Sequence, residues 1–102
     1  MALIVQKYGG TSVGTVERIQ AVADSVIDTK EEGHQVIVVL SAMNGETDRL
    51  LSLAKQLSNT PSLRELDVLL STGEQVTIAL LSMALEEKGY SAVSYTGSQV
   101  HI

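Results

Sequence analysis

The stretch Lys7-Tyr8-Gly9-Gly10-Thr11-Ser12-Val13-Gly14 decides how the rest of the chain can fold. It follows the apolar run Leu3-Ile4-Val5 and precedes a helical pattern that begins near Val16. The apolar β-branched run is typical of a strand, the closely spaced glycines of a tight turn, and the helical periodicity of a helix. The order of these segments therefore predicts the beginning of an α/β fold.

The same turn is suited to holding an anion. Glycines let the backbone adopt positive φ and approach a ligand closely, while amides in the turn and at the helix start point outward as donors. Lys7 stands at the strand end, so its ammonium can share whatever anion the amides hold. The turn is neither G-x-x-x-x-G-K-[ST] nor G-x-G-x-x-G, and a strand-end lysine is ordinarily an exposed surface residue. A structural turn and an anion site both remain open.

The composition of the chain argues against several classes of function. The chain has 102 residues, enough for one domain, with 44% hydrophobic residues and no cysteine. A net charge of −5 and the lack of Phe and Trp argue against a nucleic-acid partner. No uninterrupted apolar run approaches the roughly 18 residues that span a bilayer. His34 and His101 lie too far apart to indicate a metal site. We expect a soluble cytoplasmic protein with no membrane contact.

The first half of the chain predicts a strand, a crossover helix and a second strand. Apolar residues recur at helical spacing from about Thr15 to Glu32, and Gly33 supplies the stop. The continuous apolar run from Val36 to Leu40 is typical of a parallel strand covered on both faces. Parallel strands end at one edge of the sheet, so Lys7 and Ser41 should face the same crevice.

The second half predicts two or three helices and a further strand. Thr47 or Asp48 should cap a helix that runs to about Leu57, and a break at residues 59–62 follows. A second helical stretch should be interrupted at residues 71–73 and resume as a deeply buried helix from residue 74 to 88. Residues 91–95 alternate like a third strand, with a loop from Thr96. The expected fold is a three-layer αβα arrangement with a mainly parallel sheet.

Each candidate site residue also has a purely structural interpretation. Ser41 could simply end a strand, and Thr47 could serve only as a helix cap. The spacing from Ser71 to Glu74 is that of an S-x-x-E capping box, so a capping role and a functional role for Glu74 both remain open.

Four motifs together resemble aspartokinase, of the amino acid kinase superfamily. They are Lys7-Tyr8-Gly9-Gly10-Thr11-Ser12, Ser41-Ala42-Met43, Leu70-Ser71-Thr72-Gly73-Glu74 and Thr96-Gly97-Ser98-Gln99. They follow the order of that family across the whole chain. Related kinases for acetylglutamate, glutamate or uridylate have a lysine and glycines at the first turn, but not this set.

The resemblance implies an enzyme that transfers the γ-phosphoryl group of ATP, with Mg²⁺, to the side-chain carboxylate of L-aspartate. The product is 4-phospho-L-aspartate, on the route to lysine, threonine and methionine. It implies that Lys7 is catalytic and that residues 7–12, Lys7, Tyr8, Gly9, Gly10, Thr11 and Ser12, bind the ATP phosphates. Ser41, Thr47 and Glu74 would bind aspartate, with Glu74 suited to its α-ammonium. No resident metal site is implied.

Aspartokinases are about four times as long as this chain, by the same resemblance. Residues 1–102 would then be the N-terminal, substrate-side part of the catalytic domain, without its nucleotide half and regulatory domains. We expect the full-length protein to be an active homo-oligomer and the 102-residue chain alone to be inactive. The alternatives are a non-catalytic α/β module and another member of the superfamily.

Overall fold

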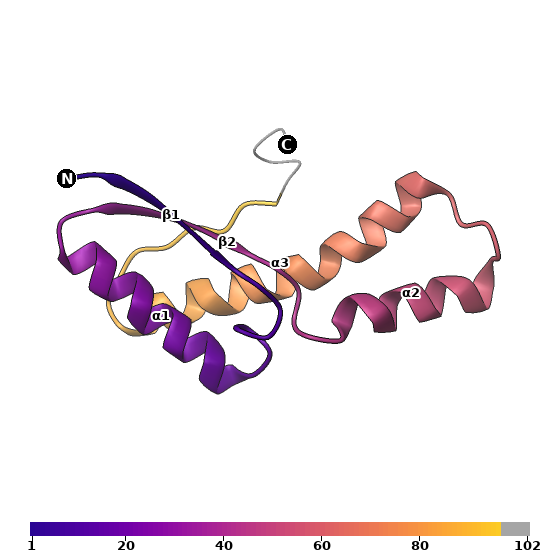
Figure 1. Cartoon of the computed structure of the whole chain (residues 1–102), viewed down its shortest axis with the longest axis horizontal. Coiled ribbons are helices and arrows are strands. Elements are labelled where there is room, and N and C mark those ends of the chain that lie inside the picture. Colours follow the sequence, from indigo (N-terminus) through magenta and orange to yellow (C-terminus); the bar gives the residue numbers. More distant parts are fainter. Residues whose placement is uncertain (97–102) are drawn as a thin grey trace.

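The computed structural model describes residues 1–96 as a sheet of two strands with three helices (Figure 1). The elements in chain order are β1 (Leu3–Tyr8), α1 (Val16–Glu31), β2 (Gln35–Leu40), α2 (Glu46–Leu57) and α3 (Leu63–Glu87). The predicted α/β class is confirmed.

The two strands are parallel, as predicted. Leu3 lies opposite Gln35 and Tyr8 lies opposite Leu40, so both strands begin and end in step. α1 connects the end of β1 to the start of β2. The carboxyl ends of both strands therefore meet at one edge of the sheet, where loops gather in open α/β folds.

α1 follows its predicted range within one residue at each end. The Thr15 hydroxyl accepts a hydrogen bond from the Arg18 amide at 3.2 Å, which caps the first turn. Gly33, with φ of 93°, lets the chain turn away toward β2. The buried face of this helix consists of Ile19, Val22, Ala23 and Val26.

The core lies on one face of the sheet, against α1 and the C-terminal half of α3 (Figure 1). Val13, from the turn after β1, is completely buried in it. On the opposite face Ile37 is 50% exposed and Val39 is 46% exposed, beside Leu3 and Val5. Helices on both faces were predicted, but within residues 1–96 helices cover only one. Because β2 is apolar on both faces, its exposed face is suited to packing against another element. The local sequence does not determine which element packs there.

α2 and the first half of α3 form a helical hairpin that extends beyond the sheet (Figure 1). The prediction that Thr47 or Asp48 caps α2 is wrong. The N-cap is Gly45, at φ of 84°, and it makes no side-chain capping bond. A turn in which the Glu46 amide donates to the Met43 carbonyl at 3.0 Å starts the helix earlier. Thr47 and Asp48 thus lie inside the first turn of α2.

α3 is one continuous helix, so the interruption predicted at residues 71–73 is wrong. The Ser71 hydroxyl donates to the Val68 carbonyl at 2.8 Å, and the Thr72 hydroxyl donates to the Leu69 carbonyl at 2.7 Å. A serine or threonine hydroxyl can bond to a carbonyl of the preceding turn while the helix continues. The cap is Ser62, whose hydroxyl accepts from the Glu65 amide at 3.2 Å.

The deep burial predicted for residues 74–88 is also wrong in the described part of the chain. Only one stripe of α3 is buried, namely Gly73, Thr77, Leu81 and Leu85, whereas Val76 and Met83 are exposed. By length and composition alone α3 could cross a membrane, although its sequence is not an uninterrupted apolar run. Its buried stripe packs against α1, α2 and β2, and Lys88 pairs with Asp24 of α1. α3 therefore packs as a core helix.

The predicted third strand is not formed. Residues 91–96 have no strand pairing, although Tyr90 and Ala92 pack against the core. An alternating pattern indicates a half-buried extended segment. A strand also requires a neighbouring strand with which its backbone can form hydrogen bonds. The rest of the predicted loop and motif, Gly97-Ser98-Gln99, lies outside the described residues.

Candidate active site

The loop between β1 and α1 consists of two consecutive tight turns. The Ser12 amide donates to the Gly9 carbonyl at 3.1 Å, and the Gly14 amide donates to the Thr11 carbonyl at 3.3 Å. Within residues 1–96 the amides of Gly9, Gly10 and Thr11 have no hydrogen-bond acceptor. Free amides in a turn are the groups that bind anions in backbone concavities.

The positive φ predicted for the glycines of this loop is wrong for Gly9, Gly10 and Gly14. Their predicted close approach to a ligand stays a prediction. A Cβ on Gly10 would lie 2.8 Å from the Ala42 carbonyl oxygen and 3.2 Å from the Asn44 nitrogen, so Gly10 permits close approach of a second loop. A Cβ on Gly9 would meet nothing within 4 Å. Gly9 thus leaves open space beside the free amides.

The second loop, between β2 and α2, is bonded directly to the first. The Ser41 amide donates to the Tyr8 carbonyl at 3.1 Å, and the Asn44 amide donates to the Gly10 carbonyl at 3.1 Å. The parallel register and this contact place Lys7 and Ser41 at the same edge of the sheet. That they face one crevice stays a prediction.

α3 packs across the second loop. The Thr77 hydroxyl donates to the Ser41 carbonyl at 2.8 Å. A Cβ on Gly73 would lie 2.8 Å from the Ala42 Cβ and 3.3 Å from the Glu46 Cγ. Glu74 follows Gly73 in α3 and Thr47 follows Glu46 in α2, so both are next to residues in this contact. Ser41, Thr47 and Glu74 come from the second loop, α2 and α3, and these three segments meet at one end of the sheet.

Lys7 and Tyr8 point to opposite faces of β1, because successive side chains alternate along a strand. Lys7 is exposed, and it makes no ion pair or hydrogen bond within residues 1–96. The Tyr8 hydroxyl lies 2.8 Å from the Gln6 Oε1 and 3.1 Å from the Ser25 Oγ of α1. The Tyr8 side chain therefore joins β1 to α1, and its carbonyl holds Ser41.

Two carboxylates stand near the contact between α2 and α3, and only one of them is paired. Glu46 forms an ion pair with Arg49 at 2.6 Å. The hydrogen bond from Arg49 lowers the pKa of Glu46, and the same bond raises the pKa of Arg49. Glu74 is exposed and has no ion pair in the described part of the chain. Glu74 is thus the carboxylate that remains free to meet a cation.

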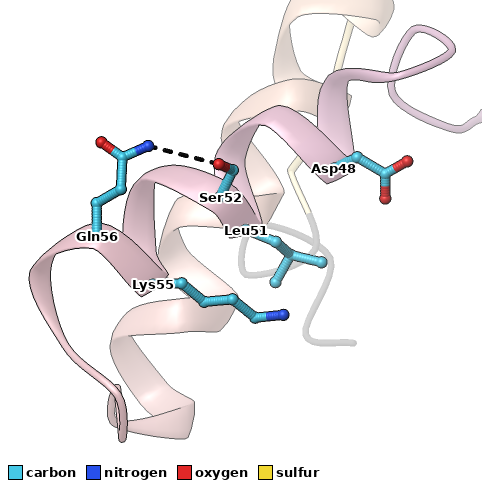
Figure 2. Close-up of a pocket in the computed structure, with 5 residues that line it drawn as sticks. All are labelled: Asp48, Leu51, Ser52, Lys55 and Gln56. Carbon is cyan, nitrogen blue, oxygen red and sulfur yellow. Dashed lines mark hydrogen bonds between the residues drawn. The ribbon is translucent and has the colours of Figure 1, made fainter.

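A shallow hollow on the outer side of α2 is separate from these loops. Figure 2 shows its lining residues along one side of the helix, with Gln56 hydrogen-bonded to Ser52. The five lining residues are Asp48, Leu51, Ser52, Lys55 and Gln56. All five come from a single helix, and within residues 1–96 no other element contributes a group. We interpret this hollow as ordinary helix surface.

Gly73 and Thr77 were not singled out from the sequence. The available signal was a pair of small residues four positions apart in an apolar helix, a spacing that places them on one face. Such a pair indicates close packing, but it does not identify the partner. The structure identifies it as the loop that contains Ser41 and Ala42.

Gly73→Ala should destabilise the full-length protein although alanine favours helices. The gain in helix propensity is about 1 kcal/mol, whereas forcing a methyl group against Ala42 and Glu46 costs about 1–3 kcal/mol. We expect a net loss of about 1 kcal/mol in the free energy of unfolding, measured by urea denaturation. The double variant Ala42→Gly/Gly73→Ala should show a favourable coupling energy, because it removes the opposing methyl group. A more stable Gly73→Ala protein would contradict the close approach.

Comparison with known proteins defines the class to which this fold and loop arrangement belong. The family model described as the amino acid kinase family matches residues 2–102, and the chain belongs to that family. It is 67% identical over its whole length to aspartokinase 2 of Bacillus subtilis and 54% identical over 98% of its length to an aspartokinase of Helicobacter pylori. It spans 25% of the length of each of these relatives.

A solved structure has the same fold. The chain superposes on the crystal structure of aspartate kinase from Synechocystis with a TM-score of 0.91 and 61% sequence identity. The match covers 95% of this chain and 17% of that one.

Proposed function

We propose that the full-length protein is an aspartate kinase that transfers a phosphoryl group from ATP to the side-chain carboxylate of L-aspartate. The observation that supports the proposal is that the segments carrying two kinds of group are joined by hydrogen bonds and close packing at one end of the sheet. Lys7 and the free amides of the first loop suit an anion, and the unpaired Glu74 suits a cation. The similarity to aspartokinases supports the choice of substrate.

The proposed reaction needs alignment and charge neutralisation more than proton transfer. An aspartate carboxylate oxygen forms a bond to the γ-phosphorus while the bond from that phosphorus to the β-bridging oxygen breaks, giving 4-phospho-L-aspartate and ADP. The carboxylate is already ionised at neutral pH, so no general base is required. Lys7 would stabilise the negative charge on the transferring group, and the turn from Gly9 to Ser12 would supply backbone donors.

Tyr8 would contribute to this phosphate site indirectly. Its hydroxyl is engaged by Gln6 and Ser25, on the side of β1 opposite to Lys7. In the proposal Tyr8 fixes the end of the strand from which the phosphate-binding turn departs.

The substrate would bind through groups from the second loop, α2 and α3. The Glu74 carboxylate would pair with the α-ammonium of aspartate, and the hydroxyls of Ser41 and Thr47 would donate to its carboxylates. Thr47 is free for this role because Gly45, not Thr47, is the N-cap of α2.

The nucleotide would carry its own metal. Residues 1–96 contain no group of three His, Cys, Asp or Glu side chains that could hold a metal ion. This part of the chain therefore does not fit a resident metal centre. Mg²⁺ commonly binds to substrate phosphates together with only one or two carboxylates, so it would enter with ATP.

Residues 1–102 would be the N-terminal, substrate-side part of the catalytic domain. The relatives are about four times as long, and in the proposal the remaining chain supplies the adenine pocket, further phosphate contacts and the regulatory domains. The proposed setting is the cytoplasm, and the proposed assembly of the full-length enzyme is a homo-oligomer.

The proposal predicts that the full-length protein converts aspartate and ATP into an acyl phosphate. Hydroxylamine traps an acyl phosphate as a hydroxamate, which is measured by its coloured ferric complex. We expect hydroxamate only when both substrates are present, and none from residues 1–102 alone. Parallel assays with glutamate, acetylglutamate and uridylate test the alternative that the protein is another member of the family. Turnover of one of those acceptors without turnover of aspartate would overturn the proposal.

A further inference from the structure

Thr77 is the only buried polar side chain in the described part of the chain, and its exposed fraction is 0%. Its hydroxyl donates to the Ser41 carbonyl at 2.8 Å and lies 3.0 Å from the Glu74 carbonyl of its own helix. One buried O–H group therefore stands between the main chains of Ser41 and Glu74. These two residues come from different loop and helix segments, 33 positions apart.

Ser41 is held from two sides. Its amide donates to the Tyr8 carbonyl at the end of β1, and its carbonyl accepts from Thr77 of α3. Both polar groups of its main chain are thus fixed, one by the strand that carries Lys7 and the other by the helix that carries Glu74. Gly73 allows this approach, because it has no side chain to separate α3 from Ala42.

We propose that Thr77 is a positioning residue that fixes the relative placement of Ser41 and Glu74 for binding of the acceptor substrate. This inference rests on the proposed function, in which Ser41 binds a carboxylate of aspartate and Glu74 binds its α-ammonium. A substrate held by two such contacts is sensitive to the distance between them. Thr77 does not touch the substrate in this proposal; it acts through Ser41 and Glu74.

The hydroxyl and the methyl group of Thr77 can be tested separately. Thr77→Val keeps the shape and replaces the donor by a methyl group, which leaves the part-buried Ser41 carbonyl without this hydrogen bond. Thr77→Ser keeps the donor and removes only the methyl group. Ser82→Ala is the matched control, because the Ser82 hydroxyl donates to Ile78 of its own helix at 2.9 Å and does not reach the second loop.

The experiment is steady-state kinetics of the four full-length proteins, wild type included, with aspartate and ATP varied separately and with the thermal midpoint recorded. We expect Thr77→Val to raise the KM for aspartate about 10-fold while the KM for ATP stays within about twofold. Thr77→Ser and Ser82→Ala should both retain a near-normal KM for aspartate.

The outcomes separate this inference from the proposed function. If the wild-type protein does not phosphorylate aspartate, the proposed function fails and the inference fails with it. If the wild type is active but Thr77→Val loses thermal stability with an unchanged aspartate KM, the hydroxyl is only structural and the inference alone is overturned. Equal effects on the KM values of aspartate and ATP would also overturn it. If Thr77→Val does not fold, Thr77→Ala takes its place as the variant that lacks the hydroxyl. An aspartate KM raised in Thr77→Ala but not in Thr77→Ser, with the ATP KM unaltered in both, would support the inference, and an unchanged aspartate KM in Thr77→Ala would overturn it.

Discussion

Lys7→Ala in the full-length protein should lower kcat about 10²–10³-fold, as expected for the loss of one preorganised charge that acts mainly in the transition state. Lys7 is exposed and makes no ion pair within residues 1–96, so its removal should leave the thermal midpoint nearly unchanged. The KM for aspartate should change much less than kcat, because the proposed contact is with the transferring phosphoryl group. Hydroxamate assays with both substrates saturating measure the effect.

A second lysine provides the control for this prediction. Lys55 lies in the last turn of α2 (Figure 2), whereas the first turn of that helix is the one that follows the second loop. Lys55→Ala removes the same charge and should leave kcat within about twofold, since surface charges outside a site have small effects. A Lys7→Ala protein with near-normal kcat and reduced thermal stability would instead support an ordinary strand-end lysine.

Glu74→Gln should weaken the use of aspartate about 30- to 1000-fold in kcat/KM, which corresponds to roughly 2–4 kcal/mol. The change removes a charge-assisted hydrogen bond to the substrate α-ammonium and keeps the size of the side chain. The capping role that competed with this one is excluded, because Ser71 lies within α3 and donates to Val68. The thermal midpoint and the KM for ATP should therefore change little.

Glu87→Gln is the matched control for Glu74→Gln. Glu87 is an exposed glutamate at the C-terminal end of the same helix, and it has no proposed contact with substrate. Its replacement should leave kcat/KM for aspartate unchanged. Steady-state kinetics that gave Glu74→Gln and Glu87→Gln the same kcat/KM would remove Glu74 from the proposed substrate site.

Local sequence signals located most of the secondary structure. The apolar run before Lys7 gave β1, and the helical spacing after Gly14 gave α1, because both patterns depend on residues that are neighbours in the chain. The assignment of the helix start in α3 was wrong because it relied on a serine. Ser71 in an S-x-x-E pattern looked like a cap, whereas Ser62 begins the helix. The same hydroxyl can cap a helix or bond within it, and packing over the whole of α3 decides between the two.

The candidate site was also only partly predictable from the sequence. The sequence located the turn from Lys7 to Ser12 and named Ser41, Thr47 and Glu74 through family resemblance. It did not reveal that Gly10 is a contact point for the second loop or that Thr77 bonds to the Ser41 carbonyl. These contacts join residues more than 30 positions apart, and a single sequence has no local pattern that records them.

By itself the sequence determined the α/β class, the parallel direction of β1 and β2 and the edge at which their loops gather. Each follows from periodicity and from the geometry of a crossover connection. Only the tertiary structure decided that α3 is unbroken, that Gly45 begins α2, that residues 91–96 form no strand and that one face of the sheet is uncovered within residues 1–96. Those features depend on contacts between segments that are distant in the chain. The free energy gained by burying a residue or its hydrogen bond depends on the group that it contacts as much as on the residue itself.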